Sequence, residues 1–486
     1  MQGSRIDLSP GEERDLLRDV ADRIAAYRED LSVLRCPVEG RGDLASLRRS
    51  IAECDFREPW GLTRVLEFVT SAMRDHQVHS SHPGYFGLFN PRPTAAGLAG
   101  DLLAAGFNPN LANWSNSPFG AEVERHLISE LGRKLAMPPA IDGIFTSGAS
   151  ESNLTAVLCA LEARFPGVSK RGLASLGKRP TLYCSAEAHH SLEKAARASG
   201  LGEVALRRIR VASSRMVTSA LEEEIVRDLN CGNQPLLVAA TVGSTATGGI
   251  DDLSRVAECA KRFGLWLHTD AAWAGAAALA PTFSRELHGL CESDSIAIDA
   301  HKWLATPIAA GVFLVAHRGV LEPVFETSPT YMPAGTVTAD HLESFRRSLP
   351  WSRRFAALGL FMSLLAHGWE GLQDHIVKMV ALGRLLRAEL ERAGWRIENE
   401  TPLPLVCFGP IAVPGVDRRA MVEGIVRCVL EENAEWLSTA ELDPQGAVLR
   451  VCITNATTSA EDVRRLVMSL NTARESVLAA IGPASR

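Results

Sequence analysis

Several residues in the middle of the chain have side chains that could do chemistry together if the fold brings them close. Residues 147–150, Ser-Gly-Ala-Ser, join an apolar run to a helical pattern, so their hydroxyls and backbone N–H groups would lie at a helix N-terminus. Such a terminus favours anions such as phosphate. Asp270 and Lys302 each follow an apolar run, and His189 lies shortly after another. A sheltered carboxylate or amine is costly without a partner, so we expect a ligand or an ion pair for both.

Each of these features has an ordinary structural explanation when it stands alone. Residues 147–150 could be a capped helix, Asp270 could pair with an arginine, and Lys302 could be a surface lysine at a strand exit. His189 and His190 could cap a helix or ligate a metal ion. The segment around the two histidines shows no recognisable set of cysteine and carboxylate ligands, so we predict no metal site.

The combination is much more specific than any of its members. A phosphate cup, a carboxylate for a pyridinium nitrogen and a lysine for a Schiff base are the groups that a protein contributes to pyridoxal 5'-phosphate (PLP) chemistry. They occur here in the order phosphate turn, histidine, aspartate, lysine. The sequence therefore predicts a PLP site that contains residues 147–150, His189, Asp270 and Lys302.

Short apolar runs alternate with helical stretches and would position these groups. The runs are 181–184, 236–243, 266–273, 295–301 and 310–317, and 252–263 is one of the helical stretches between them. This alternation is typical of an α/β domain with a mostly parallel sheet. Ligands of such sheets bind at the carboxyl ends of the strands. His189, Thr245 and Lys302 follow runs there, and Asp270 lies in the second half of the run 266–273.

The chain divides into three expected parts. We expect an N-terminal helical segment with a substrate loop over 1–100, a large PLP-binding α/β domain over 101–350, and a small C-terminal α+β domain over 351–486. Residues 11–75 have helical spacing of apolar positions, whereas 76–118 form long stretches rich in Pro, Gly and Asn. Long loops inside a compact protein are usually functional.

Composition excludes several classes of function. The 486 residues carry a net charge of −6, so there is no basic excess for nucleic acid. No apolar run reaches the length of a membrane span, and the first residues show no secretory signal pattern. The ten cysteines are scattered without a CxxC pair, which argues against a disulfide framework. We therefore predict a cytoplasmic protein.

With these motifs in place, the sequence resembles the PLP-dependent group II amino acid decarboxylases, which include the aromatic amino acid, histidine and glutamate decarboxylases. The resemblance covers roughly residues 60–470. It is carried by "HPGYFGLFNP", "TSGASESNL", "SAEAHHSLEKA", "ATVGSTATGGIDD", "HTDAAWAG", "DAHKWL", "SPTYMP" and "PWSRRFAALGLF". It implies PLP-dependent transferase fold type I, similar to aspartate aminotransferase, and a homodimer with active sites at the subunit interface.

The resemblance also implies a role for each matching residue. Lys302 looks like the Schiff-base lysine, Asp270 like the partner of the ring nitrogen, and His189 like the imidazole stacked on the ring. Tyr331 resembles the loop tyrosine that helps to protonate the carbanion after carbon dioxide leaves, and it is therefore a fourth catalytic candidate. The other cofactor contacts would be Gly148, Ala149, Ser150, Thr245, Ala272 and His301. The substrate contacts would be His82, Phe89, Asn90 and Arg353.

The substrate loop departs from both well-known subfamilies. Phe89, Asn90 and Ala112 stand where the aromatic enzymes carry rings, and Leu88 replaces a glutamine of the glutamate enzymes. Asn90 and its polar neighbours make the rim polar, which favours a small, polar or acidic amino acid as substrate, although Asn also occurs in loops for turn geometry. The sequence does not identify that amino acid.

Other PLP enzymes remain as alternatives. An aldehyde synthase, which decarboxylates oxidatively, is the main rival, because only one residue argues against it: relatives of that kind carry phenylalanine where this chain has Tyr331. A transaminase is disfavoured by the resemblance alone. A cysteine desulfurase needs a cysteine in a loop past the lysine, and none lies between Cys291 and Cys407. A non-enzymatic PLP binder is disfavoured because Lys302, Asp270 and the other matching residues are intact.

Overall fold

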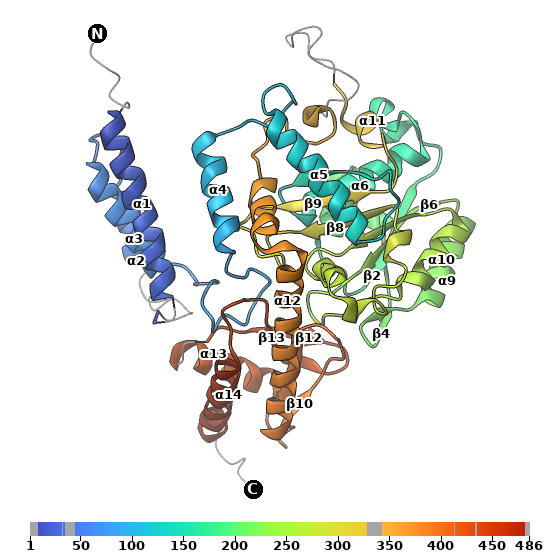
Figure 1. Cartoon of the computed structure of the whole chain (residues 1–486). Coiled ribbons are helices and arrows are strands. Elements are labelled where there is room, and N and C mark those ends of the chain that lie inside the picture. The colour runs from blue at the N-terminus through green and yellow to red at the C-terminus, as the bar shows by residue number, and fades with distance from the viewer. Residues whose placement is uncertain are drawn as a thin grey trace.

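A seven-stranded sheet lies at the centre of the computed structural model, which describes residues 8–31, 33–34, 44–327, 343–412, 414–432 and 435–481. Its strand order is β1-β9-β8-β7-β6-β2-β3, and every strand except β9 runs in the same direction (Figure 1). In chain order these strands are β1 (Asp142–Thr146), β2 (Pro180–Ser185), β3 (Leu206–Ile209), β6 (Gln234–Thr241), β7 (Trp266–Asp270), β8 (Ser295–Asp299) and β9 (Gly311–Val315). The predicted α/β fold with a mostly parallel sheet is confirmed, and all five apolar runs are strands.

Helices cover both faces of this sheet, because successive residues of a strand point to opposite sides. In β2, Leu182 and Cys184 pack with α6 (Ala149–Arg164) and α8 (Ser191–Ala198), whereas Tyr183 lies in the core on the other face. That second core includes residues of α5, α9 and α10. These helices span Pro118–Lys134, Thr218–Asn230 and Leu253–Phe263. Burial on both faces explains why the strands read as continuous apolar runs.

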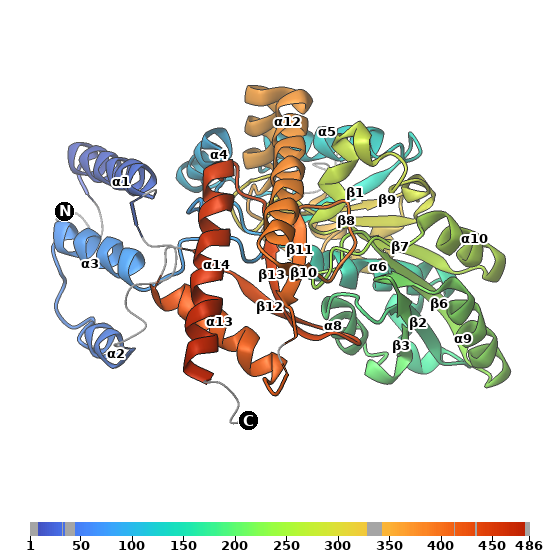
Figure 2. The same ribbon diagram turned by 90° about the horizontal axis from the view of Figure 1, so that it is seen from below.

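A smaller domain follows the long helix α12 (Ala357–Arg392), which changes direction at Gly368, where φ is 64°. Its four-stranded antiparallel sheet has the order β10-β11-β13-β12. The strands are β10 (Trp395–Ile397), β11 (Leu405–Pro410), β12 (Ser438–Leu442) and β13 (Gly446–Cys452), and the helices are α13 (Arg418–Glu432) and α14 (Ala460–Ile481). Figure 2 shows α12, α13 and α14 gathered around these strands. The predicted C-terminal α+β domain is confirmed.

The N-terminal helices stand apart from this body in both views (Figures 1 and 2). They are α1 (Pro10–Asp30), α2 (Leu44–Ala52) and α3 (Leu62–Asp75), and no side chain described in them is buried. The next helix, α4 (Ala95–Phe107), packs on α12, where a Cβ on Gly100 would come 3.0 Å from the Gly359 Cα. Within the described ranges, no helix is long and apolar enough to cross a membrane.

Candidate active site

A cavity of about 190 Å³ opens at the carboxyl ends of β6 and β7, beside the turn that follows β8. Residues from the loop before α4, from the ends of β6 and β7 and from the turn that contains Lys302 meet here. The lining residues are Leu88, Phe89, Asn90, His189, Thr241, Gly243, Ser244, Thr245, Asp270, Ala272, Trp273 and Lys302. The sequence-predicted residues His189, Thr245, Asp270, Ala272, Lys302, Phe89 and Asn90 are therefore brought together, at the edge of the sheet where ligands of α/β proteins bind.

Asp270 ends β7 and keeps 6% of its surface exposed. Its Oδ2 accepts a hydrogen bond from the Asn153 Nδ2 at 2.8 Å, and its Oδ1 accepts one from the Ala272 backbone N–H at 3.2 Å. A carboxylate that already has these neutral donors can still accept from a protonated ring nitrogen. Asp270 therefore fits the pyridinium-binding role.

Lys302 lies in the turn after β8, and its ammonium has a buried partner. The Nζ is 2.8 Å from the Asp299 Oδ2, and the Asp299 side chain is 3% exposed. The other oxygen, Asp299 Oδ1, accepts the Ala149 backbone N–H at 2.7 Å. Asp299 thus joins the lysine to the start of α6. The partial burial of Lys302, whose side chain is 22% exposed, is tolerated because its charge is paired.

The predicted phosphate turn lies next to this pair rather than in the wall of the cavity. Gly148 caps α6. A Cβ on Gly311 of β9 would come within 2.6 Å of the Gly148 Cα, so the close approach of β9 to the turn after β1 requires glycine at 311. The His301 ring hydrogen-bonds the Ala310 backbone through Nδ1, and its Nε2 lies 3.8 Å from the Asp299 carboxylate. A phosphate at this turn would have to share the Ala149 N–H with Asp299.

His189 presents a neutral imidazole to the cavity. Its Nδ1 lies 2.8 Å from the Ser191 Oγ and accepts the Ser191 backbone N–H at 3.2 Å. Burial lowers the pKa of His189 below the ordinary value, although the Asp270 carboxylate opposes the shift. A neutral ring of this kind is suited to stacking on a cofactor.

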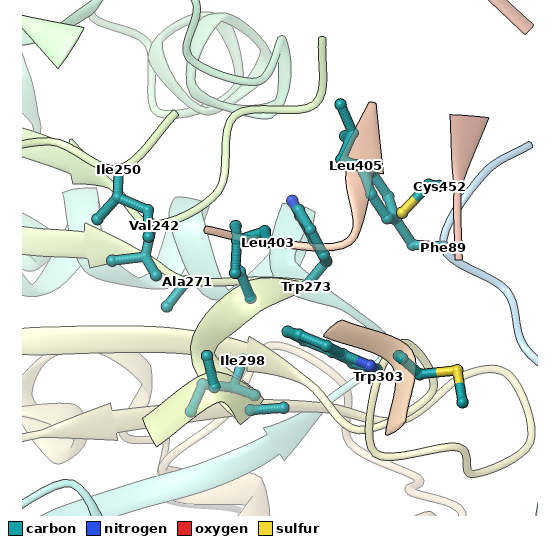
Figure 3. Packing of buried hydrophobic residues seen from close by; sticks show 14 of the residues in the cluster. Phe89, Val242, Ile250, Ala271, Trp273, Ile298, Trp303, Leu403, Leu405 and Cys452 are labelled. Atoms are coloured by element: carbon teal, nitrogen blue, oxygen red, sulfur yellow. The ribbon is translucent and has the colours of Figure 1, made fainter. Parts of the chain in front are cut away.

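Aromatic side chains close the opposite wall. Phe89 stacks on Trp273 with ring centroids 4.5 Å apart and an angle of 15° between the rings. The Trp273 indole donates to the Gly243 carbonyl at 2.6 Å, which fixes its orientation. Figure 3 shows Phe89, Trp273 and Trp303 in one packed cluster with Leu405 and Cys452 of the small domain. The small domain therefore supports the wall of the cavity.

The substrate loop reaches the cavity because its backbone pairs with the small sheet. The Phe86 N–H donates to the Trp436 carbonyl at 2.8 Å, and the Phe86 carbonyl accepts the Cys452 N–H at 2.9 Å. These bonds hold the chain across the sheet three residues before Phe89. The residues of the site fit PLP: Asp270 for the ring nitrogen, Lys302 for covalent attachment, His189 for one face of the ring, and the α6 N-terminus with Ser150 for the phosphate.

The comparisons with known proteins agree with this chemistry. The pattern of the pyridoxal-dependent decarboxylase conserved domain matches residues 57–410. The chain belongs to the pyridoxal-dependent decarboxylase family. It is 30% identical to tyrosine decarboxylase 4 of Petroselinum crispum over 87% of the chain and 85% of that protein. It is 27% identical to the aromatic-L-amino-acid decarboxylase of Bacillus atrophaeus over 97% of each chain.

Solved structures share the fold of this pyridoxal-dependent decarboxylase. Mouse CSAD in its apo form superposes with a TM-score of 0.89 at 24% identity, covering 96% of this chain and 99% of that chain. The 4-hydroxyphenylacetaldehyde synthase of Rhodiola rosea superposes with a TM-score of 0.86 at 22% identity, covering 97% of this chain and 99% of that chain. At these identities the likeness concerns the fold, which is PLP fold type I, as predicted.

Two predicted substrate contacts lie elsewhere in this decarboxylase. His82 is 2% exposed, its Nδ1 accepts the Gly84 N–H at 2.9 Å, and it packs against the small domain rather than lining the cavity. Arg353 donates to both carboxylate oxygens of Glu124 and to the Phe145 carbonyl, so its donors serve a buried ion pair. Tyr331 lies outside the described residues.

Sequence reasoning missed three buried residues that contact the site. Asn153 holds Asp270, Trp273 forms a wall, and Arg450 lies behind Phe89 with its guanidinium carbon 5.0 Å from the ring centroid. Trp273 stands in the "HTDAAWAG" motif three residues after Asp270, so the sequence could have indicated it as a residue of the site. Asn153 stands in the "TSGASESNL" motif but reads there as an ordinary polar residue of a helix, and Arg450 stands in none of the quoted motifs.

Proposed function

We propose that this pyridoxal-dependent decarboxylase removes the α-carboxylate of an L-amino acid as carbon dioxide, and that the substrate's side chain is small and polar or acidic. The carboxy-lyase chemistry belongs to the family. The substrate class is the specific part of the proposal. It rests on one buried arginine beside the cavity, Arg450.

Arg450 is 3% exposed, yet no carboxylate pairs with it among the described residues. Its Nε donates to the Thr245 carbonyl at 2.8 Å, and its Nη1 donates to the Gly87 carbonyl at 2.7 Å. Its Nη2 is buried without a hydrogen-bond partner in the described structure. Thr245 lines the cavity, and Gly87 directly precedes lining residues.

A buried guanidinium without a counterion attracts an anionic group to the neighbouring cavity. The Phe89 ring is close to both cations: its centroid is 5.0 Å from the Arg450 guanidinium carbon and 5.9 Å from the Lys302 Nζ. Asn90, half-buried at the rim, adds an amide that can donate to a polar side chain. An acidic side chain in the cavity would be attracted by the Arg450 charge, and a polar one could accept from the Asn90 amide, whereas a purely apolar side chain gains neither interaction.

The chain's own groups have separable tasks in the reaction. PLP, when bound, supplies an electron sink for the pair of electrons left by carbon dioxide. Asp270 favours the protonated ring nitrogen, and Asp299 holds the Lys302 ammonium 2.8 Å away when that amine is free. Phe89 and Trp273 exclude water from one wall of the cavity.

We assign the proton delivered to Cα to the Tyr331 hydroxyl, as the family resemblance implies. A phenylalanine at this position would remove that proton donor, and the relatives that form aldehydes with oxygen carry phenylalanine there. The tyrosine therefore favours simple decarboxylation over aldehyde formation.

We also propose that the working enzyme is a cytoplasmic homodimer whose active sites lie at the subunit interface. None of the described side chains of α1, α2 and α3 is buried in a single chain. Leu62, Val65, Val69 and Met73 recur at helical spacing along α3 and are exposed. A second copy of the chain would cover this apolar face, which is costly to leave in water.

The deciding experiment incubates the PLP-loaded protein with proteinogenic and acidic non-proteinogenic amino acids in air, and reads the products by mass spectrometry. The expected product is an amine that lacks the carboxylate, formed from a polar or acidic substrate and absent with Lys302→Ala. Conversion of aromatic amino acids alone would contradict the substrate class. An aldehyde with oxygen uptake would instead identify an aldehyde synthase and overturn the role given to Tyr331.

A further inference from the structure

A chain of buried hydrogen bonds leads from Trp266 to the two residues that would hold the cofactor ring. Its members are Trp266, Ser295, His268, Asn153, Asp270, Ser191 and His189. Asn153, His268 and Ser295 have no exposed surface, and Ser191 is 1% exposed. Hydrogen bonds in such a dry environment are strong, and an unpaired member is costly.

The Asp270 end of the chain fixes the directions of the bonds to His268, and the Trp266 end is compatible with them. The Trp266 indole can only donate, so the Ser295 Oγ accepts from it at 2.9 Å and can donate its own hydrogen to the His268 Nδ1, also at 2.9 Å. At the other end an ionised Asp270 can only accept, so the Asn153 Nδ2 must face it at 2.8 Å. The Asn153 Oδ1 then faces the His268 Nε2 at 2.8 Å, which must carry the hydrogen.

The Asp270 end therefore gives His268 the tautomer with hydrogen on Nε2 and a free pair on Nδ1, to which the Ser295 hydroxyl can donate. Burial supports a neutral ring, because it lowers the pKa of His268 to about 4, even though the Asp270 charge acts in the opposite direction. The orientation of the Asn153 amide therefore follows from the pattern of donors and acceptors.

Asn153 also controls the second ring-binding residue. Its Nδ2 has a further hydrogen, which it donates to the Ser191 Oγ at 2.7 Å. Ser191 can then donate its hydroxyl hydrogen to the His189 Nδ1 at 2.8 Å, alongside its backbone N–H. The His189 Nδ1 is thus an acceptor, and its hydrogen is on Nε2. One amide group orients both the carboxylate and the imidazole.

We propose that Asn153 is a positioning residue for the cofactor: its amide aims the Asp270 carboxylate at the ring nitrogen and, through Ser191, holds His189 in the Nε2–H tautomer. The role concerns cofactor binding in the same site as the proposed function. The test of this role needs no amino acid substrate. The role of Asn153 can therefore be refuted while the substrate assignment stands, and the substrate assignment can be refuted while the role stands.

The test compares PLP binding by Asn153→Leu, Asn153→Asp and the control Asn455→Leu. Asn455 is 1% exposed and donates to the His82 carbonyl, so the control removes a similarly buried amide away from the cavity. The dissociation constant of PLP is measured by quenching of tryptophan fluorescence, since Trp273 lines the cavity. The visible absorbance of the bound cofactor and the melting temperature of the PLP-free protein are recorded for each variant.

Asn153→Leu should raise the dissociation constant roughly ten- to a hundredfold, because a hydrogen bond to a charged group is lost. Asn153→Asp should raise it at least as much, since it places a second carboxylate oxygen next to Asp270 while still accepting from His268. Asn455→Leu should stay within about twofold of the wild type. Wild-type affinity and absorbance in both Asn153 variants would overturn the proposal, as would an equal loss in the control.

A measurement on the wild-type protein covers the case in which the Asn153 variants fail to fold. In protein labelled with ¹⁵N-histidine, both His268 and His189 should show the Nε2–H tautomer, with the signals assigned by His268→Asn and His189→Asn. A His268 ring with its hydrogen on Nδ1 would reverse the Asn153 amide, point its oxygen at Asp270, and refute the proposed role.

Discussion

Arg353 gives the sharpest test of whether a motif residue serves the substrate or the fold. Its side chain is 4% exposed, that of Glu124 is 8% exposed, and the two form a bidentate ion pair at 2.9 and 3.2 Å. The Arg353 Nη2 also donates to the Phe145 carbonyl at 2.7 Å. Arg353→Met would therefore leave a buried carboxylate and a carbonyl without their donor.

Removal of one partner of a buried pair costs about 3–5 kcal/mol. With an unfolding entropy of about 2.1 cal/mol/K per residue, 486 residues give roughly 1 kcal/mol/K, so the melting temperature of the PLP-free protein should fall by roughly 3–5 °C. A second change, Glu124→Met, should restore most of this loss, because two apolar side chains replace the pair without a buried charge.

Arg354→Met is the matched control. Its side chain is 53% exposed and pairs with Asp101 at the surface, so the loss should be below about 1 kcal/mol. Thermal unfolding of the wild type and of these three variants, with activity measured on any substrate found, completes the assay. If Arg353→Met kept the wild-type melting temperature but lost turnover, the structural reading of Arg353 would be wrong and the substrate role would stand.

Three further outcomes follow from groups described above. Arg450→Gln should lower kcat/KM for an acidic substrate about tenfold, because the attraction of the guanidinium charge for the substrate across the Phe89 ring is lost, with a much smaller effect on a neutral polar substrate. Steady-state kinetics on both substrates would show an equal loss if the arginine only supports the fold. Burial lowers the pKa of both His82 and His268 to about 4, so each ring binds a proton more readily in the unfolded protein than in the folded one. The free energy of unfolding should therefore fall as the pH drops from about 6.5 towards 4. At pH 5 the loss should be about 2 kcal/mol per group. Melting curves against pH should show a shallower acid limb for His82→Asn, whose oxygen can still accept the Gly84 N–H; an unchanged limb would remove His82 as a cause. Val69→Glu, on the exposed apolar face of α3, should shift the protein from dimer to monomer in sedimentation, and an unchanged dimer would exclude this face as the interface.

The strand ends of the site could be predicted because each depends on local sequence. Asp270 and Lys302 follow strands whose burial on both faces leaves an uninterrupted apolar run, and parallel strands end at one edge. The polar side chain after such a run is therefore close to a ligand site wherever the strand lies in the sheet. This reasoning needs no knowledge of distant contacts.

Asn153 and Arg450 could not be predicted in this way, because their partners are remote in sequence. Asn153 contacts Asp270 across 117 positions, and Arg450 contacts the Gly87 carbonyl across 363. In the sequence, Asn153 is one polar residue on a helix and Arg450 one charge in an alternating strand. His82 was misleading for the opposite reason: it stands beside the substrate loop in the chain, but its ring is used by the turn at Gly84.

The position of β9 between β1 and β8 has a consequence for the order of folding. β1 pairs only with β9 in the described sheet, and the register joins Asp142 to Val315 and Thr146 to Gly311. The turn at Gly148, directly after β1, thus has no strand beside it until about residue 315 has left the ribosome. Contacts of such long sequence separation form slowly. The cofactor pocket must be among the last parts of the large domain to assemble, and until then the apolar edge of β1 is open to wrong pairing.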